Sequence, residues 1–357
     1  MDEEIYPGIQ TPGTTQDKGM YNIFKHIFNN LGIDLGTANT VIYDDKKGYV
    51  VDQPSFIAFN KQSDVIAYGT RAKEMLGKTS EVIRVIRPLA DGVIADFVAG
   101  EEMVKAFIRS AAVPRYMIGK VIMGVPTGIT AVEKIAVIES GERAGAREVY
   151  LIAEPMAAAV GVGLNVMGKQ GHMIVDIGGG TTDIAVIAYG GIVVDSTIRI
   201  AGDEMNEAIV RYFKSKFHMR IGESTAERLK IEYGTVLEKY NSKTVVVKGL
   251  DVATGLPRQM IVSNSIFIEA LKDIVEIMIS AVVNTIEKLP LDLLNDILER
   301  GIILTGGGSL LRGLDELISA RTMLPVHVAD NALYTVAEGT KKILNDFDFY
   351  KRILIKR

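Results

Sequence analysis

Two glycine-rich turns of matching pattern, one in each half of the chain, constrain the fold more than any other feature. The first is IDLGTANT at residues 33–40, and the second is VDIGGGTTD at residues 175–183. In each, an apolar strand leads into an aspartate and a glycine turn with threonines, after which a second apolar strand begins. Such a turn exposes backbone N–H groups that can cradle an anion. One loop alone is more often an ordinary hairpin, but two matching loops favour a shared ligand.

The residue types in these loops suit phosphate and a hard cation. Asp34 and Asp176 stand just before the turns, and a carboxylate repels phosphate unless a cation such as Mg²⁺ lies between them. Neither loop fits the Walker A pattern, nor a G-x-G-x-x-G that opens a helix, so P-loop and Rossmann enzymes are excluded. A third cluster, LTGGGSLL at residues 304–311, follows an apolar strand. It indicates either close backbone approach to a ligand or a simple turn into a helix.

Composition narrows the class of protein. The 357 residues carry a net charge of −4, which argues against a dedicated nucleic-acid binder. There is no cysteine, which excludes disulfides and thiolate metal sites. The four histidines are scattered along the chain, which argues against a histidine-rich metal site. No apolar run is long enough to span a membrane, and residues 1–19 have no secretory pattern. These two observations predict a cytoplasmic protein. The acidic composition of residues 1–19, rich in Pro, Gly and Thr, predicts a disordered tail.

Helix and strand patterns alternate along the chain, which predicts an α/β fold. Residues 101–112, 130–144, 203–218 and 265–287 have helical patterns, with strand patterns between them. Residues 20–31 also have helical spacing, with Met20, Phe24, Ile27, Phe28 and Leu31 on one stripe. This stripe predicts an amphipathic helix that lies at a membrane surface or, alternatively, packs on the first domain.

Several segments, in order, resemble the MreB family of bacterial actin homologues within the actin-like ATPase superfamily. They include RPLADGVIADF, AGAREVYLIAEPMAAAVG and IGESTAERLKIEYG, and the resemblance runs from about residue 20 to the C-terminus. It implies two ribonuclease-H-like domains around a nucleotide cleft, each with a small inserted subdomain. The implied boundaries are 32–172 with 325–357 for domain I (insertion about 50–88), and 173–324 for domain II (insertion about 207–262).

The resemblance also implies ATP and Mg²⁺ as ligands. Asp34 and Asp176 are expected to hold Mg²⁺ through water. The residues implied for phosphate contacts are Thr37, Ala38, Asn39, Gly178, Gly179, Gly180, Thr181 and Thr182, with Thr182 close to the chemistry. Those implied for the nucleoside are Glu227, Lys230, Gly306, Gly307, Gly308 and Ser309, together with Gly202, Asp203 and Asn206 near the start of a helix.

Glu133 has two interpretations. The segment GITAVE fits a capping box in which Thr130 caps a helix and Glu133 reaches back to it. The resemblance instead implies that Glu133 positions the water that attacks the γ-phosphate. The family usually has glutamate where this chain has Asp183, and an acidic pair where this chain has Ala153 and Glu154.

By the same resemblance, the chain is expected to hydrolyse ATP and to form homopolymer filaments at the inner face of the cell membrane. There it would organise wall synthesis together with shape proteins, with no nucleic-acid partner. Expected membrane contacts are Phe24, Ile27 and Phe28, and the loop tip of Tyr116, Met117 and Ile118. A monomeric actin-fold kinase and a chaperone-type ATPase remain alternatives, because single glycine loops occur throughout the superfamily.

Overall fold

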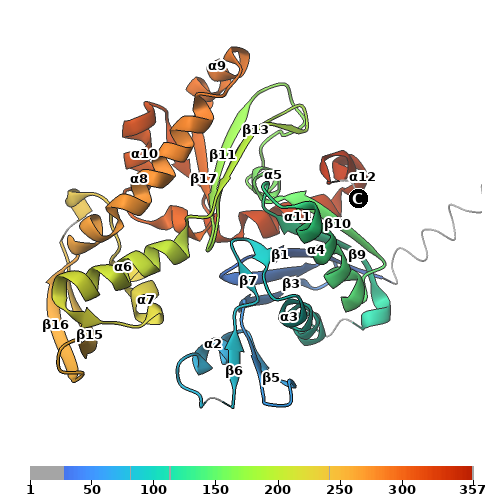
Figure 1. Cartoon of the computed structure of the whole chain (residues 1–357). Coiled ribbons are helices and arrows are strands. Elements are labelled where there is room, and N and C mark those ends of the chain that lie inside the picture. Colours follow the sequence, from blue (N-terminus) through green and yellow to red (C-terminus); the bar gives the residue numbers. More distant parts are fainter. Residues whose placement is uncertain (1–27, 81, 112–113, 241, 356–357) are drawn as a thin grey trace, which may run out of the picture.

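Two five-stranded sheets form the framework of the molecule (Figure 1). The computed structural model describes residues 28–80, 82–111, 114–240 and 242–355. The first sheet has the order β10 (Glu148–Ala153), β9 (Ile118–Val125), β1 (Asn29–Leu35), β2 (Asn39–Asp44), β3 (Gly48–Pro54). The second has the order β13 (Gly191–Ile198), β12 (Thr182–Ala188), β11 (His172–Ile177), β17 (Ile302–Thr305), β18 (Val326–Val328).

The two sheets share one topology. In each, three consecutive strands form an antiparallel meander. One later strand pairs in parallel with the first strand of the meander, and a second later strand pairs in parallel with that one. Each glycine loop is the turn between the first two strands of its meander. The repeated loops therefore mark a repeated domain, as the sequence predicts.

Helices cover both sheets and join them. The first sheet packs against α3 (Phe97–Ser110) and α4 (Ala131–Ala144), and the second against α8 (Ile266–Ile286), α9 (Leu291–Arg300) and α10 (Leu314–Thr322). Between the sheets lie α5 (Glu154–Gly161) and α11 (Thr335–Asn345), which α12 (Phe347–Tyr350) follows. The crossing of α5 and α11 is close, because a Cβ at Gly161 would overlap the Thr335 carbonyl and one at Gly339 the Ala157 carbonyl.

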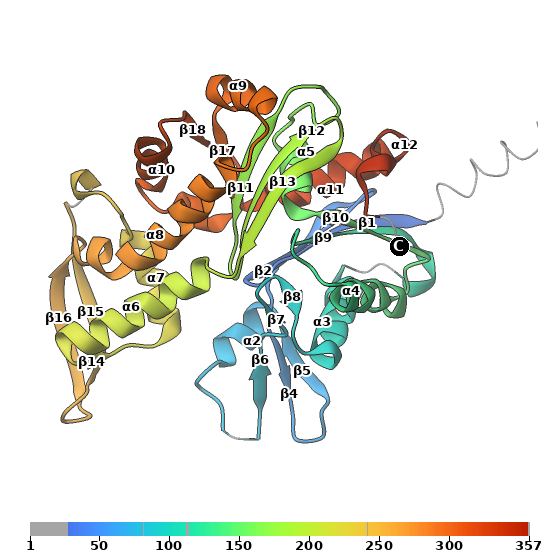
Figure 2. The same cartoon turned by 45° about the horizontal axis from the view of Figure 1, so that its top comes forward.

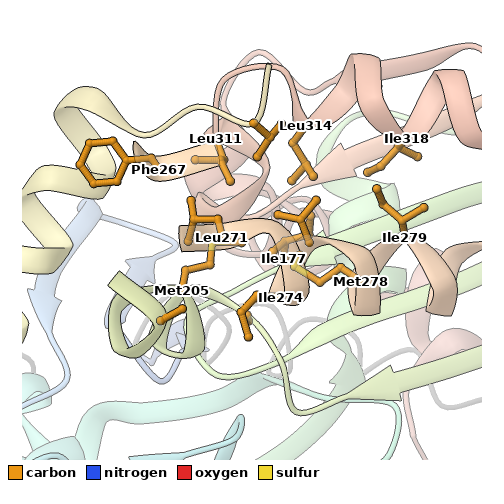
Figure 3. Close-up of a cluster of buried hydrophobic side chains, with 14 of the residues drawn as sticks. Ile177, Met205, Phe267, Leu271, Ile274, Met278, Ile279, Leu311, Leu314 and Ile318 are labelled. Carbon is orange, nitrogen blue, oxygen red and sulfur yellow. The ribbon is translucent and has the colours of Figure 1, made fainter. Parts of the chain in front are cut away.

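The largest apolar core lies between the second sheet and helix α8. Figure 3 shows side chains of α8, among them Leu271, Ile274 and Met278, gathered with Met205 and Leu314. All of these are at most 8% exposed. Transfer of apolar surface from water contributes about 25 cal/mol per Å², so this layer holds the second domain together around its sheet.

Two small inserted parts lie on the same side of the molecule (Figures 1 and 2). The first contains β4 (Ile57–Phe59), β5 (Val65–Tyr68), α2 (Thr70–Met75) and β6 (Arg84–Ile86), and the short hairpin β7 (Leu89–Ala90) and β8 (Val93–Ile94) follows it. The second contains α6 (Gly202–Phe217), β14 (Met219–Arg220), α7 (Glu223–Tyr233), β15 (Thr244–Asp251) and β16 (Pro257–Ser263). No helix among the described residues has the length and apolar character to cross a membrane.

Two predicted boundaries need correction. Residues 20–27 of the predicted amphipathic helix lie outside the described part of the chain, and Asn29 to Leu31 belong to strand β1. The helix prediction is wrong there because these residues pair with β2 and β9. The second sheet also continues past residue 324, since Val326–Val328 forms its edge strand.

Candidate functional site

A cavity of about 290 Å³ lies between the two sheets, where the glycine loops face each other. All three glycine clusters line it, as do the beginnings of helices α5 and α6. The predicted site residues that it brings together are Asp34, Thr37, Ala38, Asn39, Asp176, Gly178, Gly179, Gly180, Thr181, Gly202, Asp203, Asn206, Glu227, Lys230, Gly306, Gly307 and Gly308. Residues from both halves of the chain thus converge on one site.

The two phosphate-type loops are in contact across this cavity. A Cβ at Gly179 would lie 2.9 Å from the Ala38 side chain, and one at Gly180 would lie 3.0 Å from Thr37 Oγ1. The same hydroxyl accepts a hydrogen bond from the Gly92 backbone at 2.9 Å. Glycine is needed here because any larger side chain would separate the loops. Backbone N–H groups of both domains can therefore approach one anion.

Three carboxylates face the cavity at its base. Asp34 and Asp176 end the first strands of the two meanders, and Glu154 begins α5. Burial raises the pKa of Asp34 to about 7, with the Asp176 charge adding to it, and burial likewise raises the pKa of Asp176 to about 7. The pKa of Glu154 is also raised well above its ordinary value, mainly by burial. Thr305 Oγ1 donates to Asp176 Oδ1 at 2.8 Å, which fixes that carboxylate.

These three carboxylates suit a bound cation. Their raised pKa values report negative charge that is poorly compensated by the protein. Within the described residues, no group of three or more His, Asp or Glu side chains is arranged to hold a metal directly. With Asp34 and Asp176 as its protein ligands, an ion here would take the rest of its shell from water and ligand oxygens, a mode that Mg²⁺ prefers. Sequence reasoning missed Glu154, although its place directly after a buried strand is a detectable signal.

The far end of the cavity is built by the second domain. The Lys230 ammonium donates to the Gly202 carbonyl at 2.6 Å, and this contact ties α7 to the start of α6. Opposite them lie Gly306, Gly307 and Gly308, together with the apolar side chains of Leu310 and Leu333. A flat, partly apolar ring system could lie between these two walls.

Comparison with known proteins identifies the family. A model of the MreB/Mbl protein family matches residues 28–352. The chain belongs to the MreB/Mbl family. The cell shape-determining protein MreB of Escherichia coli K12 is 44% identical over 339 residues, covering 93% of this chain and 98% of that protein. The corresponding protein Mbl of Bacillus subtilis 168 is 43% identical over 321 residues, covering 89% of this chain and 96% of its own length.

A solved structure of the MreB/Mbl family has the same fold. MreB5 of Spiroplasma citri, crystallised with AMPPNP, superposes with a TM-score of 0.87 at 34% identity. The match covers 91% of this chain and 98% of that one. The predicted family and the predicted actin-like α/β fold are both confirmed.

Three residues predicted for the MreB/Mbl site do not line the cavity. Thr182 is fully buried and its hydroxyl donates to the Ile200 carbonyl at 2.7 Å, so it is unavailable to a ligand in this conformation. The Ser309 hydroxyl donates to the Gly306 carbonyl at 2.7 Å and thereby stabilises the backbone of the third glycine cluster. Glu133 forms the capping box, with Oε2 2.8 Å from the Thr130 backbone nitrogen and 2.7 Å from the Thr130 hydroxyl. Its predicted role in hydrolysis therefore requires a rearrangement.

Ion pairs connect the two inserted parts beside the cavity of this MreB/Mbl protein. Arg87, at the end of the first inserted part, lies 2.5 Å from Asp203 on α6, with Glu223 at 3.5 Å. Lys73 on α2 pairs with Glu227 on α7 at 2.8 Å. Burial raises the pKa of Asp203 to about 6, while Arg87 and Lys230 oppose this shift. No sequence pattern predicts these pairs, because the partners are 116 and 154 positions apart.

The predicted membrane residues have different surroundings. Phe24 and Ile27 lie outside the described residues. The ring of Phe28 is half-buried, with the Arg147 guanidinium 3.8 Å from its centre. Tyr116 is 76% exposed and Met117 is partly exposed, as a surface tip requires. Ile118 is fully buried, so its prediction as a membrane contact is wrong, because strand β9 already begins there.

The ligand-free protein should lose stability as the pH rises from about 5 to 8. Asp34 and Asp176 have folded pKa values of about 7, above the ordinary value of 3.8 for an aspartate, so the folded state binds more protons in this window. The free energy of unfolding therefore falls as pH rises through the folded pKa, by on the order of 2–3 kcal/mol for each of the two carboxylates. Urea denaturation at several pH values measures it.

The matched variant for that titration is Asp34→Asn, which removes one of the two charges. His172, whose pKa burial lowers, has the opposite effect on stability but is present in both proteins. The fall in stability should therefore be smaller in Asp34→Asn than in the wild type. Equal slopes in both proteins would contradict the assignment.

Proposed function

We propose that this MreB/Mbl protein is an ATPase that assembles into cytoskeletal filaments and helps to determine cell shape by organising cell-wall synthesis. The observation that carries the proposal is the pair of matched glycine loops whose aspartates, Asp34 and Asp176, meet in one cavity. The relatives named as cell shape-determining proteins support the biological role. The AMPPNP in the Spiroplasma citri structure supports a nucleotide as the ligand.

ATP would lie with its phosphates between the two loops and its base near the third glycine cluster. Backbone N–H groups around Ala38 and Gly179 would bind phosphate oxygens, and Lys230 and Glu227 would contact the nucleoside. Mg²⁺, held by Asp34 and Asp176 through water, would screen the charge that develops during phosphoryl transfer. Glu133 would leave its capping position to orient the attacking water.

Closure of the cleft would link this chemistry to assembly. The two sheets are joined through α5 and α11, and the pairs Arg87–Asp203 and Lys73–Glu227 connect the two inserted parts. A ligand bound by both domains favours the closed arrangement, and hydrolysis removes part of that preference. A head-to-tail contact that repeats without closing then produces a filament from copies of this chain.

Sedimentation tests assembly against the alternatives. With ATP and Mg²⁺, the pelleted fraction should rise sharply above a threshold protein concentration, and it should stay low without nucleotide. A monomeric actin-fold kinase would stay in the supernatant and would consume ATP only when a hydroxyl substrate is added. A chaperone-type ATPase would also stay in the supernatant, and its turnover would respond to unfolded polypeptide.

We place the filament in the cytoplasm at the inner face of the membrane, with wall-synthesis or shape proteins as further partners. The apolar stripe with Phe24 and Phe28 and the exposed tip at Tyr116 support this placement. One such site binds weakly, whereas many along a filament bind by avidity.

Liposome co-sedimentation tests the membrane contact. Filaments of the wild type should bind anionic liposomes, and Phe24→Glu with Phe28→Glu should release them without blocking assembly. Charge in the apolar stripe opposes insertion into the interface. A double variant that still binds the liposomes would show that this segment is not the anchor, and one that fails to fold would assign the stripe to the core.

A further inference from the structure

Four polar side chains form a row across the second sheet. The strand registers place Thr305 opposite Asp176, Asp176 opposite Asp183, and Asp183 opposite Thr197. A hydroxyl binds a carboxylate at each end of the row: Thr305 Oγ1 lies 2.8 Å from Asp176 Oδ1, and Thr197 Oγ1 lies 2.7 Å from Asp183 Oδ1. Cross-strand neighbours share one face of a sheet. The row thus joins an aspartate assigned to magnesium with Asp183, for which the proposed function gives no role.

Asp183 and Thr197 hold a loop that belongs to the other domain. Residues 126–130 connect strand β9 of the first sheet to helix α4. The Thr127 backbone N–H donates to Asp183 Oδ1 at 3.0 Å, and the Gly128 backbone N–H donates to Thr197 Oγ1 at 3.2 Å. The hydroxyls of Thr127 and Thr197 are 2.7 Å apart and share a further hydrogen bond. Two consecutive backbone donors of the first domain are therefore bound by side chains of the second.

Asp183 is only 1% exposed, so water cannot replace the protein groups that donate hydrogen bonds to its carboxylate. Burial raises the pKa of Asp183, and hydrogen bonds from Thr197, Thr127 and Thr181 lower it. A buried carboxylate that loses its donors is destabilised by its uncompensated desolvation, so the loop is held where the donors meet it. Thr181 also lines the cavity. Asp183 is thus linked both to the phosphate loop and to the loop that precedes α4.

We propose that Asp183, together with Thr197, is a positioning residue for ATP hydrolysis, fixing the loop before α4 and thereby the location of Glu133 relative to the γ-phosphate. This inference rests on the proposed function. Thr130 ends this loop, and Glu133 follows three residues later on the first turn of α4, bonded to Thr130. The position of the loop therefore sets the point from which the Glu133 side chain turns toward the γ-phosphate when it leaves its capping bonds. Hydrogen bonds from Thr130 and the charge of Arg199 lower the pKa of Glu133, so this carboxylate lies within electrostatic reach of the second domain.

The test compares Thr197→Val, which removes the hydroxyl but keeps the shape, with Thr197→Ser, which keeps the hydroxyl. Thr197→Val should lower kcat by about 10- to 100-fold, because small misplacement of a catalytic group has effects of that size. The KM for ATP should stay unchanged, since Thr197 does not line the cavity. Thr197→Ser should restore most of kcat. Hydrogen exchange at the Thr127 and Gly128 amides should speed up in the valine variant only.

A double-mutant cycle tests whether the effect passes through Glu133. In a Glu133→Gln background, Thr197→Val should cause little further loss of kcat, whereas multiplied losses would overturn the inference. Wild-type kcat with wild-type amide exchange in Thr197→Val would also overturn it. If Thr197→Val does not fold, the same readouts on Asp183→Asn, which keeps an acceptor oxygen, replace it. A wild-type chain that releases no phosphate from ATP would instead refute the proposed function itself, and the inference with it.

Discussion

Asp34→Ala and Asp176→Ala should each abolish magnesium-dependent release of phosphate from ATP. The two carboxylates come from corresponding positions in the two sheets and face one cavity. Neither can be replaced by the other, because each approaches the ion from a different domain. A bound metal stabilises the charge of a phosphoryl-transfer transition state by several kcal/mol. Phosphate release at saturating ATP measures the loss.

Stability measurements separate loss of the metal site from loss of folding. Partial burial and the Asp176 charge both disfavour the ionised form of Asp34, so Asp34→Asn should leave the ligand-free protein at least as stable as the wild type. Asp195→Ala, an exposed carboxylate on strand β13 of the second sheet, is the matched control and should keep full turnover. Wild-type phosphate release in either cavity variant would rule out the proposed magnesium role.

Glu133→Ala should retain ATP affinity and lose most hydrolysis. A positioned general base contributes about 10²–10⁴-fold to a rate. In the present conformation the Glu133 carboxylate accepts from Thr130, so its removal should also lower the free energy of unfolding by about 1 kcal/mol. Phosphate release and thermal unfolding on one preparation measure both effects.

Thr130→Ala is the control for that experiment, because it removes the helix cap and keeps the carboxylate. It should destabilise the protein by a similar amount and retain most of the turnover. If Glu133→Ala is destabilised but fully active, Glu133 serves only as part of the cap.

The sequence predicted best those parts of the site that lie close together along the chain. The loops around Asp34 and Asp176 each combine a strand end, a glycine turn and a carboxylate within a few residues, so one segment carries the whole pattern. The duplicated fold followed from the repetition of these loops. Lys230 lines the same cavity, and its contact with the nucleoside stays a prediction.

Features that depend on the distant packing of the chain were not predictable in this way. No spacing rule connects Arg87 with Asp203, or Thr127 with Asp183, because these contacts arise only after the two domains meet. The prediction for Ile118 is wrong because an apolar residue next to a surface tip suits a membrane contact and the first position of a buried strand equally well. Glu133 fits a cap and a water-positioning role equally well in sequence, and only its contacts separate them.

The cavity between the two sheets should bind ATP together with Mg²⁺. Isothermal titration of the wild-type chain with ATP, with and without Mg²⁺, measures this binding. We expect one site per chain, with affinity at least about tenfold weaker in the absence of Mg²⁺, which corresponds to about 1.4 kcal/mol. Binding that is absent, or that is equally strong without the metal, would contradict the account.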